Sequence, residues 1–137
     1  MQERIEIARA PAEVWDVVAD RANDPHWCRK VKAVERVSGD EWNVWHRPVP
    51  LRPVALLKTQ HIRAEAPTYL VMREEDDASV FIVEYRLDPT PSGTALTQIS
   101  EFNWKKLPGA LQPIFAYGVR RDIRGQLRDL KRLLETP

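Results

Sequence analysis

The stretch LPGALQPIFAYGVRRDIRGQLRDLKRLLE, residues 107–135, decides the fold of this chain. Its apolar residues recur at the spacing of one helix face, and its arginines and lysines collect on the opposite face. The apolar stripe consists of Leu111, Phe115, Val119, Ile123, Leu127, Leu130 and Leu134, with Ile114 beside it. The pattern predicts one long amphipathic helix, with a kink at Pro113, whose stripe must cover a broad apolar surface.

The residues before this helix predict that surface, because they form a series of β-segments separated by turn residues. A helix at 11–20 and a short turn or helix around 24–27 interrupt the series after its first strand. The expected strands are 3–8, 31–37, 42–46, 56–64, 69–74, 80–87 and 94–104. The Pro-rich segment 47–53 predicts a loop or an edge, because proline donates no hydrogen bond to a sheet. Its R-x-x-P-x-x-P pattern also fits a peptide for an SH3 groove, although a stiff connection is the preferred interpretation.

Alternation predicts which side chains of the last two strands face the interior. The odd positions of 80–87 are apolar or aromatic, so Tyr85 should point inward. In 94–104 the large residues share the parity of Gln98 and Ser100, which should therefore enter the interior with them. The hairpin between the strands should make Tyr85 and Gln98 near neighbours, and a buried phenol and amide retain hydrogen-bonding capacity for a ligand.

The order of elements, carried by IEIARAPAEVWDVVAD, DPHWCRKVKAVERV, YRLDPTPSGTALTQ and the closing helix, resembles the START-related helix-grip superfamily, also called SRPBCC. Within it the chain is most similar to polyketide cyclase/dehydrase-like proteins. The resemblance spans nearly the whole chain and implies an α+β helix-grip fold. In this fold a curved antiparallel sheet of about seven strands wraps around a long C-terminal helix, with one or two short helices after the first strand. We expect residues 1–137 to form a single such domain.

The resemblance implies a small hydrophobic or aromatic metabolite bound between the sheet and the C-terminal helix, by a carrier, sensor or sequestering protein. A cavity of roughly 300–1,000 Å³ is usual for such a ligand. The candidate ligand-binding residues are Trp27, Trp45, Met72, Phe81, Tyr85, Gln98, Phe102, Trp104, Phe115 and Gly118. The alternative is a polyketide cyclase, dehydratase or aromatase acting in the same cavity. The sequence fixes no catalytic residue, and the shortage of titratable groups expected inside the cavity favours a binding protein.

Composition narrows the remaining classes of function. The formal net charge is +1, which does not predict binding to nucleic acid. His26, His46 and His61 lie in different elements, so we expect no metal site, and no motif indicates another cofactor. Cys28 is the only cysteine, and no apolar run has the length of a signal peptide or a membrane span. We therefore expect a cytoplasmic monomer or weak homodimer.

Overall fold

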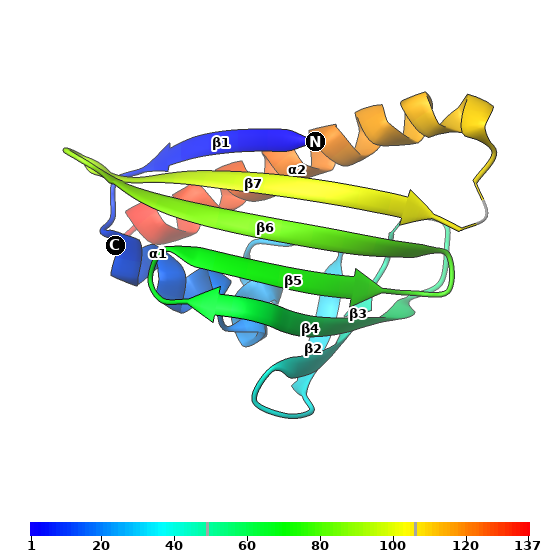
Figure 1. Cartoon of the computed structure of the whole chain (residues 1–137), viewed down its shortest axis with the longest axis horizontal. Coiled ribbons are helices and arrows are strands. Elements are labelled where there is room, and N and C mark those ends of the chain that lie inside the picture. Colours follow the sequence, from blue (N-terminus) through cyan, green and yellow to red (C-terminus); the bar gives the residue numbers. More distant parts are fainter. Residues whose placement is uncertain (49, 106) are drawn as a thin grey trace.

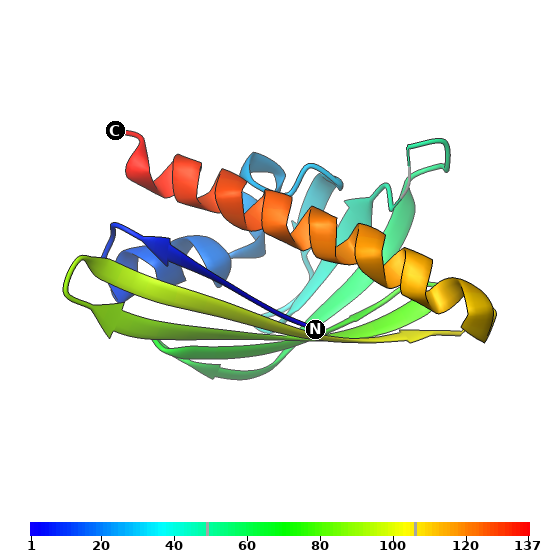
Figure 2. The ribbon, with the colours of Figure 1, turned by 90° about the horizontal axis from the view of Figure 1, so that it is seen from above.

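Seven antiparallel strands form one curved sheet that a long C-terminal helix crosses, as Figures 1 and 2 show. The computed structural model describes residues 1–48, 50–105 and 107–137. In chain order the elements are β1 (Gln2–Ile7), α1 (Pro11–Val18), the 3₁₀ helix η1 (Arg21–His26), β2 (Val31–Arg36), β3 (Glu41–His46), β4 (Ala55–Glu65), β5 (Tyr69–Glu75), β6 (Ser79–Thr90), β7 (Gly93–Trp104), the 3₁₀ turn η2 (Gly109–Leu111) and α2 (Gln112–Glu135). The predicted helix-grip fold is confirmed.

The sheet has the strand order β1-β7-β6-β5-β4-β3-β2, so each strand from β2 to β6 pairs with the next strand along the chain. The first strand closes the order by pairing with β7, which places the N-terminal strand beside the last one. The helices α1, η1 and α2 lie on one side of the sheet (Figure 2). That side therefore forms the interior, and the opposite face of the sheet is open to solvent.

The turn from β6 to β7 packs tightly against the end of β1, which explains its glycine. Gly93 has a φ of +154°, and a Cβ atom there would lie 2.1 Å from the carbonyl oxygen of Ile7. Only glycine fits such a close approach of two backbones. The neighbouring Thr94 is fully buried, and its hydroxyl donates to the carbonyl oxygen of Arg9 over 2.7 Å. This junction ties the first and last strands together.

The C-terminal helix begins later than the sequence predicts. Residues Gly109–Leu111 form the 3₁₀ turn η2, and α2 starts at Gln112. Pro113 lies in the first turn of α2, where the missing N–H has no intrahelical partner to lose, so this proline starts the helix and does not kink it. Among the described residues, no helix is both long and apolar enough to cross a bilayer.

The segment 47–53 connects β3 to β4 and contributes to no strand over its described residues, as its prolines predict. Its tip carries Leu51, whose side chain is 99% exposed. The alternative of an SH3-binding peptide includes Val49 and so falls partly outside the described residues.

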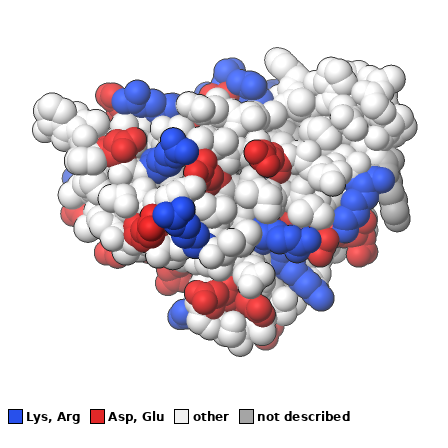
Figure 3. Space-filling model, viewed as in Figure 1, with Lys and Arg blue, Asp and Glu red and all other residues white. Residues whose placement is uncertain are grey.

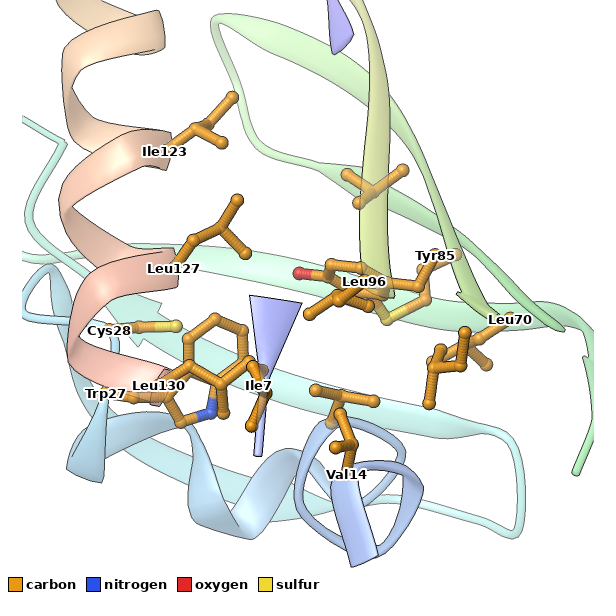
Figure 4. Packing of buried hydrophobic residues seen from close by; sticks show 14 residues of the cluster. Ile7, Val14, Trp27, Cys28, Leu70, Tyr85, Leu96, Ile123, Leu127 and Leu130 are labelled. Atoms are coloured by element: carbon orange, nitrogen blue, oxygen red, sulfur yellow. The ribbon is translucent and has the colours of Figure 1, made fainter. Parts of the chain in front are cut away.

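The main core lies at one end of the interior, under the second half of α2 (Figure 4). Leu127 and Leu130 pack there with side chains of β1, α1 and strands β5 to β7, and with Trp27 and Cys28, which follow η1. Burial decreases toward the start of the helix: Leu130 is 0% exposed, Ile123 6% and Phe115 45%. The predicted stripe is therefore covered only along its second half. The side chains of Ile114 and Tyr117 in the first turns of α2 are likewise exposed.

Candidate functional site

A cavity of about 1340 Å³ lies beneath the first half of α2, between the helix, the inner face of the sheet and the connection from β3 to β4. This volume exceeds the range expected from the sequence. Exposed apolar side chains, Leu51 on the connection and Ile114 and Tyr117 on α2, lie around this end of the molecule. Figure 3 shows the start of α2 as a broad uncharged area, whereas acidic and basic side chains are intermixed over the sheet.

Aromatic side chains from the last two strands form one wall of the cavity. Phe81 on β6 and Phe102 on β7 are direct cross-strand partners, and their rings meet edge to face with centroids 5.1 Å apart. Phe102 also stacks on Trp104, with centroids 5.5 Å apart and planes 4° apart. Such pairs hold their rings in fixed orientations, so the wall offers flat apolar surface to a ligand.

Polar side chains enter the interior next to this wall, as alternation predicts. Tyr85 and Gln98 are cross-strand partners, and each is 5% exposed. The amide nitrogen Nε2 of Gln98 donates to the hydroxyl of Ser100 over 3.2 Å, and among the described residues its buried oxygen Oε1 has no hydrogen-bond partner. The Tyr85 hydroxyl points toward α2 (Figure 4). Burial raises the pKa of Tyr85 well above its ordinary value, so the phenol remains a hydrogen-bond donor.

A buried ionic network, formed by Arg21, Asp24 and Glu74, lines the cavity. Arg21 and Asp24 lie in η1, where the segment RANDPH turns beneath α2, and Glu74 lies on β5 at the inward parity of Leu70 and Met72. The guanidinium Nη1 of Arg21 donates to Oε1 of Glu74 over 2.5 Å, and its Nε lies 2.5 Å from Oδ2 of Asp24. The network therefore joins η1 to the sheet through charged groups inside the fold.

Burial and neighbouring charge shift the proton affinities of this network. Burial raises the pKa of Asp24 to about 6, and the adjacent guanidinium of Arg21 only partly opposes this shift. Burial would lower the pKa of Arg21, but the carboxylates of Asp24 and Glu74 outweigh it and raise that pKa. The nearby thiol of Cys28 is also buried, and burial raises its pKa well above the ordinary value. Arg21 thus stays charged, and Asp24 can exchange a proton near neutral pH.

A histidine–carboxylate contact and an ion pair lie among the residues that line the cavity. The ring nitrogen Nε2 of His46 lies 3.2 Å from Oδ2 of Asp76, and burial lowers the pKa of this histidine despite the carboxylate. Lys30 and Asp122 approach within 2.6 Å and join the start of β2 to α2. Among the described residues, no group of three His, Cys, Asp or Glu side chains could hold a metal ion.

The cavity brings together nine of the ten candidate ligand-binding residues. These are Trp27, Met72, Phe81, Tyr85, Gln98, Phe102, Trp104, Phe115 and Gly118. Their contact with a ligand stays a prediction. Trp45 differs from the expectation: it is absent from the wall, because β3 buries Trp42, Val44 and His46 and turns the odd position to the outer face.

Gly118 has space beside it. A Cβ atom built on Gly118 meets no atom within 4 Å, so a close approach of the sheet does not explain this glycine. The open space beside Gly118 leaves room for a ligand.

The candidate ligand-binding residues expected from the sequence did not include Arg21, Asp24, Glu74 or His46. The alternation of Leu70, Met72 and Glu74 carried the signal for Glu74, and that of Trp42, Val44 and His46 carried it for the histidine. Arg21 and Asp24 had no periodic signal, because they lie in a short irregular helix. Their charge even argued for exposure.

Comparison with known proteins identifies one family model and several solved structures that are similar to this chain. The family model described as polyketide cyclase/dehydrase and lipid transport matches residues 1–135. A search of curated proteins found no match. Similar solved structures include a protein from Chromobacterium violaceum, with a TM-score of 0.78 and 12% identity, covering 100% of this chain and 98% of that one.

Two further structures are a START superfamily protein from Mycobacterium smegmatis and a protein from Rhodobacter sphaeroides. The first has a TM-score of 0.77 and 12% identity, and covers 93% of this chain and 92% of that one. The second has a TM-score of 0.72 and 22% identity, and covers 97% and 89%. At these identities the likeness shows a shared fold.

Proposed function

The chain belongs to the polyketide cyclase/dehydrase and lipid transport family, and on that premise we propose that it binds a small, largely apolar or aromatic molecule beneath the first half of α2. One observation carries the proposal: a cavity of about 1340 Å³ combines an aromatic wall with a few buried polar groups. This combination is typical of sites that enclose an apolar ligand and orient it through specific hydrogen bonds.

Filling the cavity from Gly118 should weaken binding without unfolding the protein. In a Gly118→Trp variant the indole would occupy open space, and the helix would lose a residue of poor helix propensity, so the melting temperature should not fall. Binding of 2-naphthol, measured by calorimetric titration, should weaken at least tenfold. Arg121→Trp, on an exposed position of α2, is the matched control and should bind like the wild type. Equal affinity in both variants would contradict the proposed site.

A second candidate function, an enzyme that cyclises or dehydrates a polyketide-like substrate, is supported by Asp24. Its carboxyl lies on the cavity wall with a pKa of about 6, and a group of this kind can accept and donate protons near neutral pH. Mass spectrometry of the ligand that co-purifies with the wild type and with Asp24→Asn separates the two functions. A binding protein yields the same compound from both, whereas an enzyme yields product from the wild type and substrate from the variant.

A further inference from the structure

The charged groups buried in the cavity wall carry a net negative charge. Asp24 is 2% exposed and Arg21 5%, and the Glu74 side chain is 13% exposed. This set holds one guanidinium and two carboxyl groups, so with both carboxyls ionised its sum is one negative charge. Coulomb interactions are stronger in a protein interior than in water, so a ligand group near these side chains would interact strongly with their excess negative charge.

The wall keeps hydrogen-bonding capacity of both kinds: the buried indole Nε1 of Trp27 is a donor without a partner among the described residues, and Glu74 and Gln98 offer acceptors. Arg21 bonds to Oε1 of Glu74, and among the described residues no donor bonds to Oε2 of that carboxylate. The buried oxygen Oε1 of Gln98 also lacks a partner among these residues. Tyr85 has a hydroxyl that can donate or accept. A buried acceptor without a partner costs free energy, which a donor on the ligand would recover.

Apart from Arg21, which is paired with Asp24 and Glu74, the basic side chains that line the cavity are either paired or exposed. Lys30 contacts Asp122 within 2.6 Å, and Lys105 contacts Glu75 within 3.0 Å. Arg52 and Lys58 are exposed. An anionic ligand group in the interior would therefore lie near a carboxylate and an amide oxygen. Among the described residues, no unpaired buried cation would offset the resulting repulsion.

From these observations we infer that the ligand carries a hydroxyl or amino group that donates to Glu74, and that the cavity selects against carboxylates of the same shape. The inference rests on the proposed function and adds to it the chemistry of the ligand's polar end. Glu74 sets the selection through its charge and its free oxygen, and the aromatic wall holds the apolar body.

Three naphthalene probes test the inference: 2-naphthol, 2-naphthylmethylamine and 2-naphthoate. Calorimetric titration of the wild type at pH 7.5 should show at least tenfold tighter binding of the alcohol and the amine than of the carboxylate. Glu74→Gln keeps the shape of the side chain and an acceptor for Arg21, and should reduce this preference at least threefold. Glu101→Gln removes the same charge from the exposed face of β7 and should leave the preference unchanged.

The outcomes separate the inference from the proposed function. Wild-type protein that binds naphthoate as tightly as the alcohol overturns the inference and leaves the binding function standing. Protein that binds none of the probes overturns both. A purely structural role of Glu74 would weaken all three probes by the same factor, and that result also overturns the assignment. Where Glu74→Gln fails to fold, Asp24→Asn removes the second buried carboxylate and should show the same loss of preference.

Discussion

Replacing Arg21 with Met should lower the free energy of unfolding at pH 7.5 by about 3–5 kcal/mol, the usual cost of leaving a buried charge without its partner. Arg21 lies within 2.5 Å of oxygens of both Asp24 and Glu74, and all three side chains lie inside the fold. Methionine fills much of the same space but supplies no charge. Urea denaturation of the variant and the wild type measures the loss.

The loss should shrink as the pH falls. The pKa of Asp24 is about 6 in the folded wild type, above its ordinary value near 3.8, because it is buried. Removing Arg21 takes away a group that lowers this pKa, so it should rise further in the variant. A carboxyl whose pKa is higher in the folded state binds a proton more readily there, so stability rises as the pH falls through that pKa. The deficit of Arg21→Met should therefore be smaller at pH 5 than at pH 7.5.

Two further sets of variants test whether the loss of stability in Arg21→Met comes from the buried network. Arg124 pairs with Glu3 over 3.1 Å on the surface of α2, and Arg124→Met should cost no more than about 1 kcal/mol. Replacing all three network residues together, with Arg21→Met, Asp24→Leu and Glu74→Leu, should restore much of the lost stability, because no charge then remains buried. A loss below about 1 kcal/mol in Arg21→Met alone would show that the network does not hold its charges in the interior.

Local patterns predicted the elements of this fold because each element repeats its signal over several residues. Alternation in β6 and β7 placed Tyr85 and Gln98 inside, and their register makes them direct partners as expected. Trp45 shows how a residue type can mislead: its aromatic character suggested a cavity wall, but its parity with Asn43 assigns it to the outer face. Parity along the strand was the stronger signal.

Such local patterns could not predict which residues far apart in the sequence contact each other. Arg21 and Glu74 are 53 positions apart in sequence, and their pairing depends on how η1 lies over β5. The position of α2 relative to the sheet could not be predicted from the sequence either. Its periodicity marks which face is apolar, but the distance between that face and the sheet depends on the length of the strands and on the elements packed beneath each turn. Phe115 therefore belongs to the predicted stripe and is nevertheless 45% exposed.

Truncating Ile123 to Ala should lower the free energy of unfolding by about 2–5 kcal/mol, which is the usual cost of removing a buried aliphatic side chain. Ile123 is 6% exposed and belongs to the core cluster that Leu127 and Leu130 continue (Figure 4). Ile114 is the matched control on the same helix, because its side chain is 68% exposed; Ile114→Ala should change stability by about 0.5 kcal/mol or less. Urea denaturation of both variants measures the difference. Equal losses would mean that the first turns of α2 pack on the sheet as tightly as the later ones, and the space assigned to the ligand would then be closed.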